Sequence, residues 1–179
     1  IITEVEMPLG PAYSWVDVII GFDSLRGATE FANSLGEQDG LALKELAVVA
    51  APAPHDYFLR HRKFLPRDSH CVIAMVADFA VDSMLAYARR FRGAELLMRS
   101  DKLTPEEAKG LPAAFELAWN HTTLRALRVD PSITYLQVLY PFPNQVELVE
   151  KIHQRFGDEL TCHLEFVRFD GKITCFGLP

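Results

Sequence analysis

The hydrophobic residues of this chain follow two spacings in turn, one typical of strands and one typical of amphipathic helices. Apolar residues fill most of 14–23, which predicts a buried strand. Ser24 is a favourable cap for a helix that we expect to end at Gly36. The apolar residues of that helix recur every three or four positions, as Leu25, Ala28, Phe31, Ala32 and Leu35. A further strand is predicted over 41–50, so the first unit is strand, helix, strand.

A second unit repeats this plan. The prolines within 51–54 end the preceding strand, and a short helix is expected over 55–64. An apolar run over 71–79 predicts a central strand, and 95–98 predicts the strand that closes the unit. Between them lies a stripe at helical spacing, formed by Val81, Met84, Leu85, Ala88 and Phe91.

A third repetition follows near the end of the sequence. Strands are expected over 133–140 and 160–169. The helical face between them consists of Val146, Val149, Ile152 and Phe156. Asp170-Gly171 predicts a hairpin turn, because glycine tolerates positive φ, and 172–177 is expected to pair back.

Successive strand, helix, strand units are typical of α+β proteins, and we predict a ferredoxin-like sandwich. The antiparallel sheet would have about seven or eight strands with helices on one face. No compositional linker divides 1–179, so a single domain is expected.

Residues 100–130 are predicted to form a helical insertion between the second and third units. Thr104, Pro105 and Glu107 together are typical of a capped helix start. A longer helix over 113–127 has apolar residues on two opposite sides. Such a helix must be covered on both sides, by the sheet on one and by a missing partner domain or a substrate cavity on the other.

Composition limits the classes of function. The 179 residues are 49% hydrophobic and 23% charged, which is typical of a globular protein. The net charge of −6 argues against a nucleic-acid partner. No apolar run reaches the roughly 18 residues of a membrane span, so none is expected. Cys71, Cys162 and Cys175 lack metal or disulfide spacing and are expected to be free thiols of a reducing cytoplasm.

The sequence contains no motif of a self-contained catalytic site. G-x-S-x-G, the P-loop, H-E-x-x-H and G-x-G-x-x-G are all missing from it. None of the six histidines stands four residues from another, as two ligands on one helix face would. We therefore expect no metal site.

The best candidate site is a polar run on the longer insertion helix, Asn120-His121-Thr122-Thr123, beside Trp119. These side chains could point hydrogen-bond donors and acceptors into a semi-enclosed cavity. His121 is the candidate catalytic residue, because imidazole exchanges a proton near neutral pH. The others are candidate substrate ligands. The alternative is that all of them merely tie the helix to neighbouring loops.

Three further residues are candidate substrate ligands. Arg125 lies one turn beyond His121 and could bind a carboxylate with two hydrogen bonds. Tyr135 and Gln137, near the following strand, could line the same cavity. Each has an ordinary alternative, because an arginine at such a position more often forms a surface ion pair, and the other two fit a strand.

Two segments resemble FAD-linked oxidases of the vanillyl-alcohol oxidase type, which include glycolate- and lactate-oxidising flavoproteins. The first is the opening, Ile1-Ile2-Thr3-Glu4-Val5 followed by Pro8-Leu9, and the second is Ile20-Gly21-Phe22-Asp23-Ser24-Leu25. The opening is similar to the junction that leads from the flavin-binding domain into the substrate-covering cap. In that family the flavin carries out the redox chemistry, while the cap shields its ring and contacts the substrate.

The resemblance implies that 1–179 is such a cap and that 1–9 is the end of the linker into it. It implies that Ile1 and Ile2 contact the flavin through their backbone. FAD would be held mainly by the FAD-binding domain of the same parent chain. The parent is expected to transfer a hydride from a small alcohol or hydroxy acid to FAD, and the fragment alone is expected to be inactive.

One branch of the family depends on a metal and carries a Gly-Asp-Gly-Asn-x-His hairpin. The similar place here is 168–174, where Thr174 stands in the position of that histidine. The resemblance therefore implies that no divalent metal is bound.

The alternative function is a ligand-sensing or interaction module, because ferredoxin-like folds serve many functions. The composition fits an oligomer as well as a monomer. A symmetric dimer with a small ligand at its interface would favour this alternative. An exposed apolar patch around Trp15, Trp119 or Tyr140 would favour the cap, because such a patch usually marks a missing partner.

Overall fold

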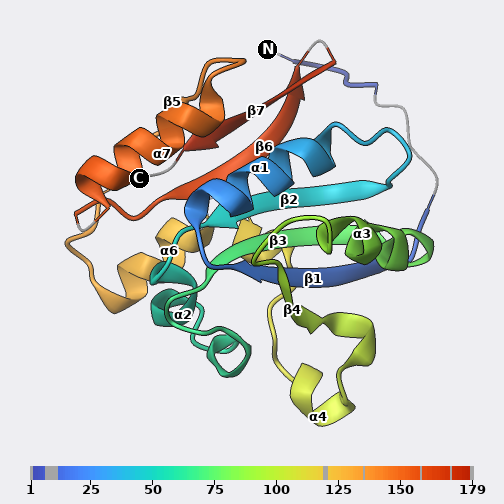
Figure 1. The fold of residues 1–179 in the computed structure, drawn as a ribbon. Helices are drawn as coiled ribbons and strands as arrows, with labels where there is room; N and C mark the ends of the chain where they lie inside the picture. The colour runs from blue at the N-terminus through green and yellow to red at the C-terminus, as the bar shows by residue number, and fades with distance from the viewer. Residues whose placement is uncertain are drawn as a thin grey trace.

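The computed structural model describes residues 2–6, 12–118, 121–134, 136–157, 159–169 and 171–177, with the backbone alone for 121–123 and 169. In this part of the chain seven strands form one antiparallel sheet in the order β4-β1-β3-β2-β6-β7-β5 (Figure 1). The predicted α+β class and antiparallel sheet are confirmed.

The first half of the chain forms a ferredoxin-like unit. Its elements are β1 (Trp15–Phe22), α1 (Leu25–Gly36), β2 (Leu43–Val49), β3 (His70–Ala77), α3 (Val81–Ala88) and β4 (Glu95–Arg99). The spatial order β4-β1-β3-β2 places the first and third strands side by side, as two interlocked strand-helix-strand units require. The two repeats read from the sequence are the two halves of this unit.

The first helix begins where its cap was expected. The Ser24 side chain accepts a hydrogen bond from the backbone N–H of Gly27 at 3.2 Å and satisfies one of the free donors of the first turn. The stripe that includes Phe31 and Leu35 is fully buried against the sheet. The helix thus buries one apolar face and leaves its polar side in water.

The second half repeats three strands and one helix of the same plan. Its elements are β5 (Val138–Leu139), α7 (Gln145–Phe156), β6 (His163–Phe169) and β7 (Lys172–Gly177). The order β5-β7-β6 matches β1-β3-β2. The hairpin between β6 and β7 turns at Gly171, whose φ of +74° is the positive value that only glycine adopts readily.

The two units join through their equivalent second strands. Antiparallel pairing of β2 with β6 sets Ala47 opposite Glu165 and Val49 opposite His163. Because the two paired strands are equivalent and antiparallel, the two units are related by an approximate two-fold axis. On one side of this seam Gln145 of α7 donates to Asn33 of α1 at 2.7 Å. The seam therefore joins the strands and also the helices.

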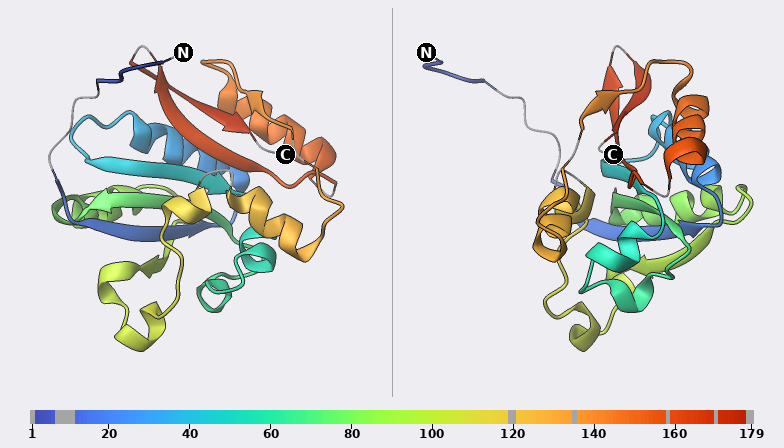
Figure 2. Two further views of the ribbon diagram at one scale, coloured as in Figure 1. Left: turned by 180° about the vertical axis from the view of Figure 1, so that it is seen from behind. Right: turned by 90° about the vertical axis from the view of Figure 1, so that its left-hand side faces the viewer.

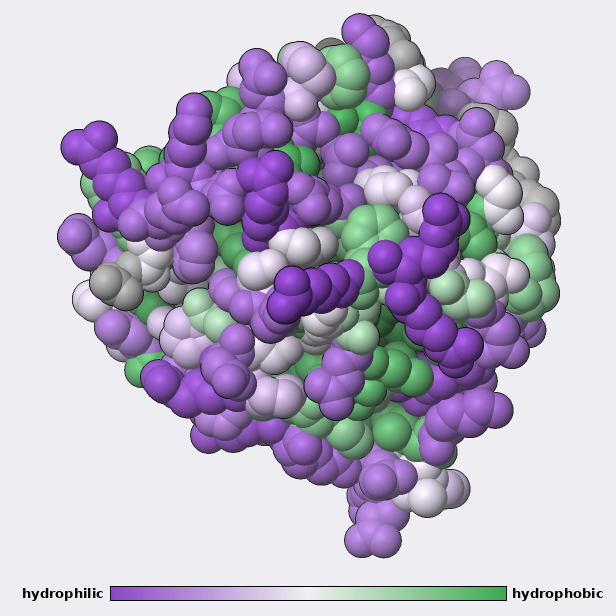
Figure 3. Space-filling model, viewed as in Figure 1, coloured by the Kyte–Doolittle hydropathy of each residue, from purple (hydrophilic) through white to green (hydrophobic). Residues whose placement is uncertain are grey.

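Helices cover both faces of the sheet. The front face, which carries α1, α3 and α7, is turned toward the viewer in Figure 1, and Figure 3 shows mainly hydrophilic side chains on that side. The back face carries one α-helix of the first unit and two of the central insertion (Figure 2). These are α2 (Ala53–Tyr57), α5 (Phe115–Ala118) and α6 (His121–Val129).

Strand β3 explains why both faces need a cover. Seven of its eight positions are buried, so its side chains form core on both sides of the sheet. The back core is smaller than the front core and brings Ile73 of β3 together with Phe58 and Leu117. The helical insertion predicted over 100–130 supplies part of this second layer.

The insertion differs in detail from the prediction. Thr104 and Glu107 form the predicted capping box, but the helix that follows, α4 (Pro105–Ala108), is a single turn. Within the helix expected over 113–127, the described helical residues are α5 (Phe115–Ala118) and α6 (His121–Val129), and residues 119 and 120 lie outside the described part of the chain.

One predicted strand is also different. The strand expected over 133–140 is limited, in the described residues, to the two residues of β5, which lies at the edge of the sheet. An edge position offers hydrogen bonds on one side only, which allows pairing to stop early. Residues 2–6 are exposed and belong to no strand.

Candidate functional site

The segment that leads to the junction of α5 and α6 is held against the back face by the partly buried carboxyl group of Asp17. Asp17 of β1 accepts a hydrogen bond from the backbone N–H of Ala114 at 3.0 Å, just before α5 begins. Its own backbone N–H donates to the Ser100 hydroxyl at 2.9 Å, at the start of the insertion. Burial raises the pKa of Asp17, although the bond from Ala114 acts in the opposite direction. One strand residue thus fixes the start of the insertion and the segment that leads into α5.

His163 of β6 is the most buried ionisable side chain at this junction. It is 1% exposed, and its Nε2 donates to the carbonyl oxygen of Ala118 at 2.7 Å, so Nδ1 is the acceptor nitrogen. Within the described residues Nδ1 has no hydrogen-bond partner. Burial lowers the pKa of His163 to about 4, so the ring is neutral at physiological pH.

Glu165 lies two residues further along β6 on the same face of the sheet. It is 6% exposed, and in the described part of the chain its Oε1 has no hydrogen-bond partner. Burial, with a smaller contribution from Glu45 on β2, raises the pKa of Glu165 to about 7. A carboxyl group with this pKa can take up or release a proton near neutral pH.

Arg125 of α6 also lies at this junction, and His61 is close enough to be affected by its charge. The Arg125 guanidinium donates to the Glu116 carboxylate at 3.1 Å, which joins α6 to α5. His61 is 2% exposed and its Nδ1 has no partner among the described residues. Burial, and then the positive charge of Arg125, lower the pKa of His61 to about 4.

We call these five residues the back-face polar cluster: His61, Glu116, Arg125, His163 and Glu165. In His61, His163 and Glu165 a buried polar atom has no hydrogen-bond partner among the described residues. Such unpaired buried atoms are uncommon in native proteins. The cluster offers acceptor nitrogens on neutral histidines and a carboxyl group poised near neutrality. Through Glu165 it can therefore hold a proton near neutral pH.

The structure brings part of the predicted site to this cluster. Arg125 belongs to it, in the ion pair that its ordinary alternative anticipated. His121, Thr122 and Thr123 form the first turn of α6, directly after the junction, and their side chains lie outside the described part. The predicted role of His121 stays a prediction.

The remaining predicted site residues lie elsewhere or are not described. Asn120 and Tyr135 lie outside the described residues, as does Ile1. Gln137 is exposed in the segment just before β5. Ile2 is 83% exposed, and none of the described contacts joins it to the sheet.

Sequence reasoning did not single out His61, His163 or Glu165. The signal for the last two was their spacing, because His163 and Glu165 fall on one side of a strand whose other side carries Leu164. Two polar residues at alternate positions ordinarily indicate a side facing water. Here the helices of the insertion cover that side.

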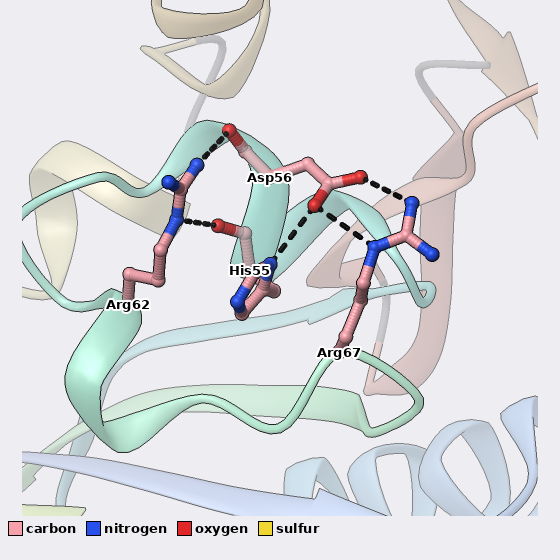
Figure 4. A network of polar contacts seen from close by, with 4 residues as sticks. All are labelled: His55, Asp56, Arg62 and Arg67. Carbon is pink, nitrogen blue, oxygen red and sulfur yellow. Dashed lines mark hydrogen bonds and ion pairs between the residues drawn. The ribbon is translucent and has the colours of Figure 1, made fainter.

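A second polar network orders the loop between β2 and β3 (Figure 4). The Asp56 carboxylate accepts from Nδ1 of His55 at 2.9 Å and from two nitrogens of Arg67 at 3.0 and 3.3 Å. Arg62 donates to the carbonyl oxygens of His55 and Asp56. The hydrogen bonds from His55 and Arg67 lower the pKa of Asp56. This network fixes the direction of the Arg67 guanidinium.

The described residues offer neither a metal-binding group nor a membrane-spanning helix. No group of three or more His, Cys, Asp or Glu side chains in this part of the chain is arranged to hold a metal ion. No helix among those described is long and apolar enough to cross a membrane.

No protein-family model matches the sequence, and no curated protein matches it either.

Proposed function

We propose that this chain is the substrate-covering cap of an FAD-dependent oxidoreductase, whose parent protein oxidises a small alcohol or hydroxy acid. The FAD-binding domain of the same parent would be its partner. In such an enzyme the bound flavin accepts the hydride, and the cap positions the substrate and excludes water. The fragment alone would be inactive.

The observation that carries this proposal is a group of exposed apolar side chains around Tyr140. Leu136 is 64% exposed and Leu139 is 55% exposed, and Val138 and Phe142 are also exposed. They lie on and beside β5, while Tyr140 itself is buried in the front core. Contiguous exposed apolar residues usually mark a surface that another protein part covers. This surface is called the β5 patch below.

A second exposed group lies around Trp15, at the start of β1. Tyr13 and Phe79 are exposed, and their rings pack edge to face with centroids 5.2 Å apart. Tyr13 also contacts the Trp15 ring at 5.7 Å. Figure 2 draws residues 2–6 away from the sheet on the side that carries α6. A partner domain reached through this segment would meet the back face.

The chemistry available on the chain fits a cap better than a complete flavin site. The sequence has no glycine-rich phosphate loop of the kind that cradles a dinucleotide. The β5 patch offers apolar cover, and the back-face polar cluster offers groups for a substrate hydroxyl. Glu165 is our candidate proton-holding residue in this cluster, beside the predicted role of His121.

Retention of FAD tests this proposal. The purified chain is mixed with excess FAD and desalted, and a longer protein that includes the residues preceding Ile1 is treated in the same way. We expect the chain alone to lose its flavin and the longer protein to keep it. Stoichiometric yellow flavin on the chain alone would show that it is not a cap.

We also propose that the parent works in the cytoplasm. Its support is that Cys71, Cys162 and Cys175 are all buried free thiols, which persist most readily in a reducing compartment. Burial raises the pKa of each thiol to about 12, so they are unreactive.

A ligand-sensing module is the second candidate. The observation that favours it is that β4 and β5 are both edge strands, and an edge can pair with a second copy of the chain. Light scattering of the purified chain separates the two candidates. A stable symmetric dimer would favour the sensing module, and a monomer would favour the cap.

A further inference from the structure

A hollow that the proposed function does not use lies at the end of the sheet where β2 stops and β3 begins. It is a pocket of about 540 Å³ between the last turn of α7 and the loop that precedes β3. Arg67 and His70 line it from the first unit, and His153 and Arg155 line it from the second. Its walls therefore come from segments far apart in the sequence.

Basic side chains and ring N–H groups gather at this pocket. Two arginines and two histidines line it beside one acidic side chain, Asp68, and Arg67 is also paired with Asp56. Guanidinium N–H groups form strong hydrogen bonds to phosphate and carboxylate oxygens. The pocket is therefore suited to an anion that accepts several hydrogen bonds.

His70 can act as a hydrogen-bond donor to a ligand without carrying a charge. Nδ1 of His70 accepts the backbone N–H of Ala51 at 3.2 Å, which leaves the ring proton on Nε2. The His70 and His153 rings lie edge to face with centroids 5.6 Å apart. Burial, and then His153, lower the pKa of His70 to about 4, while Asp23 acts in the opposite direction.

The arginines keep donors available for a ligand. Arg67 uses two nitrogens on Asp56, as Figure 4 shows, and a guanidinium has five N–H donors in all. Arg155 forms no ion pair with any described residue and lies over the Phe156 ring, 5.1 Å from its centroid. The Arg67 guanidinium is held in place by Asp56, whereas the Arg155 guanidinium is free to turn. The two groups can donate hydrogen bonds to oxygens on two sides of one ligand.

The dipole of α7 explains only half of this arrangement. Basic residues are favoured in the last turn of a helix, which accounts for His153 and Arg155. It does not account for Arg67 and His70, which come from a different segment. Their convergence on one pocket is the observation to be explained.

We propose that this pocket binds a small dianion through phosphate or carboxylate oxygens, held by Arg67 and Arg155 with an N–H donor from His70. This site lies apart from the back-face polar cluster and does not depend on the proposed cap function. It would give the protein a second small-molecule site, on the end of the sheet.

The test is a titration followed by NMR of the histidine ring signals. Inorganic phosphate and succinate are added separately to the purified chain at pH 7, with sodium chloride keeping the ionic strength constant. We expect saturable shifts of the His70 and His153 signals with at least one of the two anions, and the anion that acts identifies the preferred oxygens. No saturable shift at about 10 mM of either anion overturns the proposal.

A matched pair of variants tests the location. Arg155→Gln removes an exposed guanidinium that lies over a neighbouring ring, and Arg90→Gln does the same outside the pocket, where Arg90 lies 5.4 Å from the centre of the Tyr87 ring. We expect Arg155→Gln to weaken binding by about tenfold or more and Arg90→Gln to leave it unchanged. Equal weakening by both variants would show non-specific attraction and would overturn the proposal.

Discussion

His163 donates its Nε2 proton to the carbonyl oxygen of Ala118 at 2.7 Å, and this single hydrogen bond ties the last strand pair of the second unit to the end of α5. Both partners are buried, at 1% and 2% exposure. The contact joins residues 45 positions apart in the sequence. It therefore holds the insertion on the back face at the place where its two helices meet.

Replacing His163 by alanine should destabilise the chain by roughly 2–4 kcal/mol. The change leaves the Ala118 carbonyl buried without a donor and opens a cavity in the back layer. Urea unfolding followed by circular dichroism measures the free energy of unfolding. Gln154→Ala, at an exposed position of α7, is the control and should change that energy by less than about 0.5 kcal/mol. Equal losses in the two variants would contradict this account of His163.

Glu165→Gln should stabilise the chain at alkaline pH. The pKa of Glu165 rises from its ordinary 4.5 to about 7 on folding, so the folded state binds the extra proton and loses stability as the pH rises through 7. The variant escapes this loss. We expect its advantage to be near zero below pH 4.5 and roughly 1–3 kcal/mol above pH 7, from urea unfolding at several pH values. An advantage that is the same at all pH values would refute the raised pKa.

Acid should destabilise the protein between pH 6.5 and 4. In the folded state the pKa values of His61, His70 and His163 are about 4, against 6.5 when unfolded. The unfolded state therefore binds more protons in this range, and stability falls as the pH is lowered through it. Glu165 acts in the opposite direction above pH 4.5, so the series is best measured in Glu165→Gln. A flat stability between pH 6.5 and 4.5 in that variant would mean that the three histidines are not held neutral.

Leu139→Lys should alter the surface of the chain but not its stability. Leu139 is 55% exposed in the β5 patch, and Leu59, 56% exposed in the loop after α2, is the control. Both lysine variants should unfold within about 0.5 kcal/mol of the original chain. We expect Leu139→Lys to lower the fluorescence of the hydrophobic probe ANS more than Leu59→Lys does. In the intact oxidoreductase that we propose, only Leu139→Lys should reduce activity, and unchanged activity would argue against docking through β5.

Periodicity predicted the helices and strands well where each element buries one complete side. Leu25, Phe31 and Leu35 recur at helical spacing, so α1 and its cap at Ser24 were evident from the sequence. The repetition of the strand, helix, strand plan likewise predicted the ferredoxin-like unit. Periodicity did not predict the second layer of helices, on the back face. Strand β3 is apolar on both sides, and its sequence does not indicate which helices cover each side.

The candidate site was predicted only in part for a related reason. The insertion was recognised as unusual because its apolar residues lie on two sides, and this led to Arg125 at the α5–α6 junction. His163 and Glu165 are distant in sequence and meet the junction only through the pairing of β2 with β6. Whether a polar residue of a strand faces water or a helix depends on tertiary structure, which local spacing does not contain.

The seam between the two units also has a consequence for local unfolding. Only three residue pairs join β2 to β6, whereas eight join β1 to β3. Amide hydrogen exchange should therefore divide the molecule, with β6 and β7 losing protection together while β1 and β3 stay closed. The half of the sheet that opens first is the half that carries Glu165, so solvent would reach that carboxyl group without global denaturation.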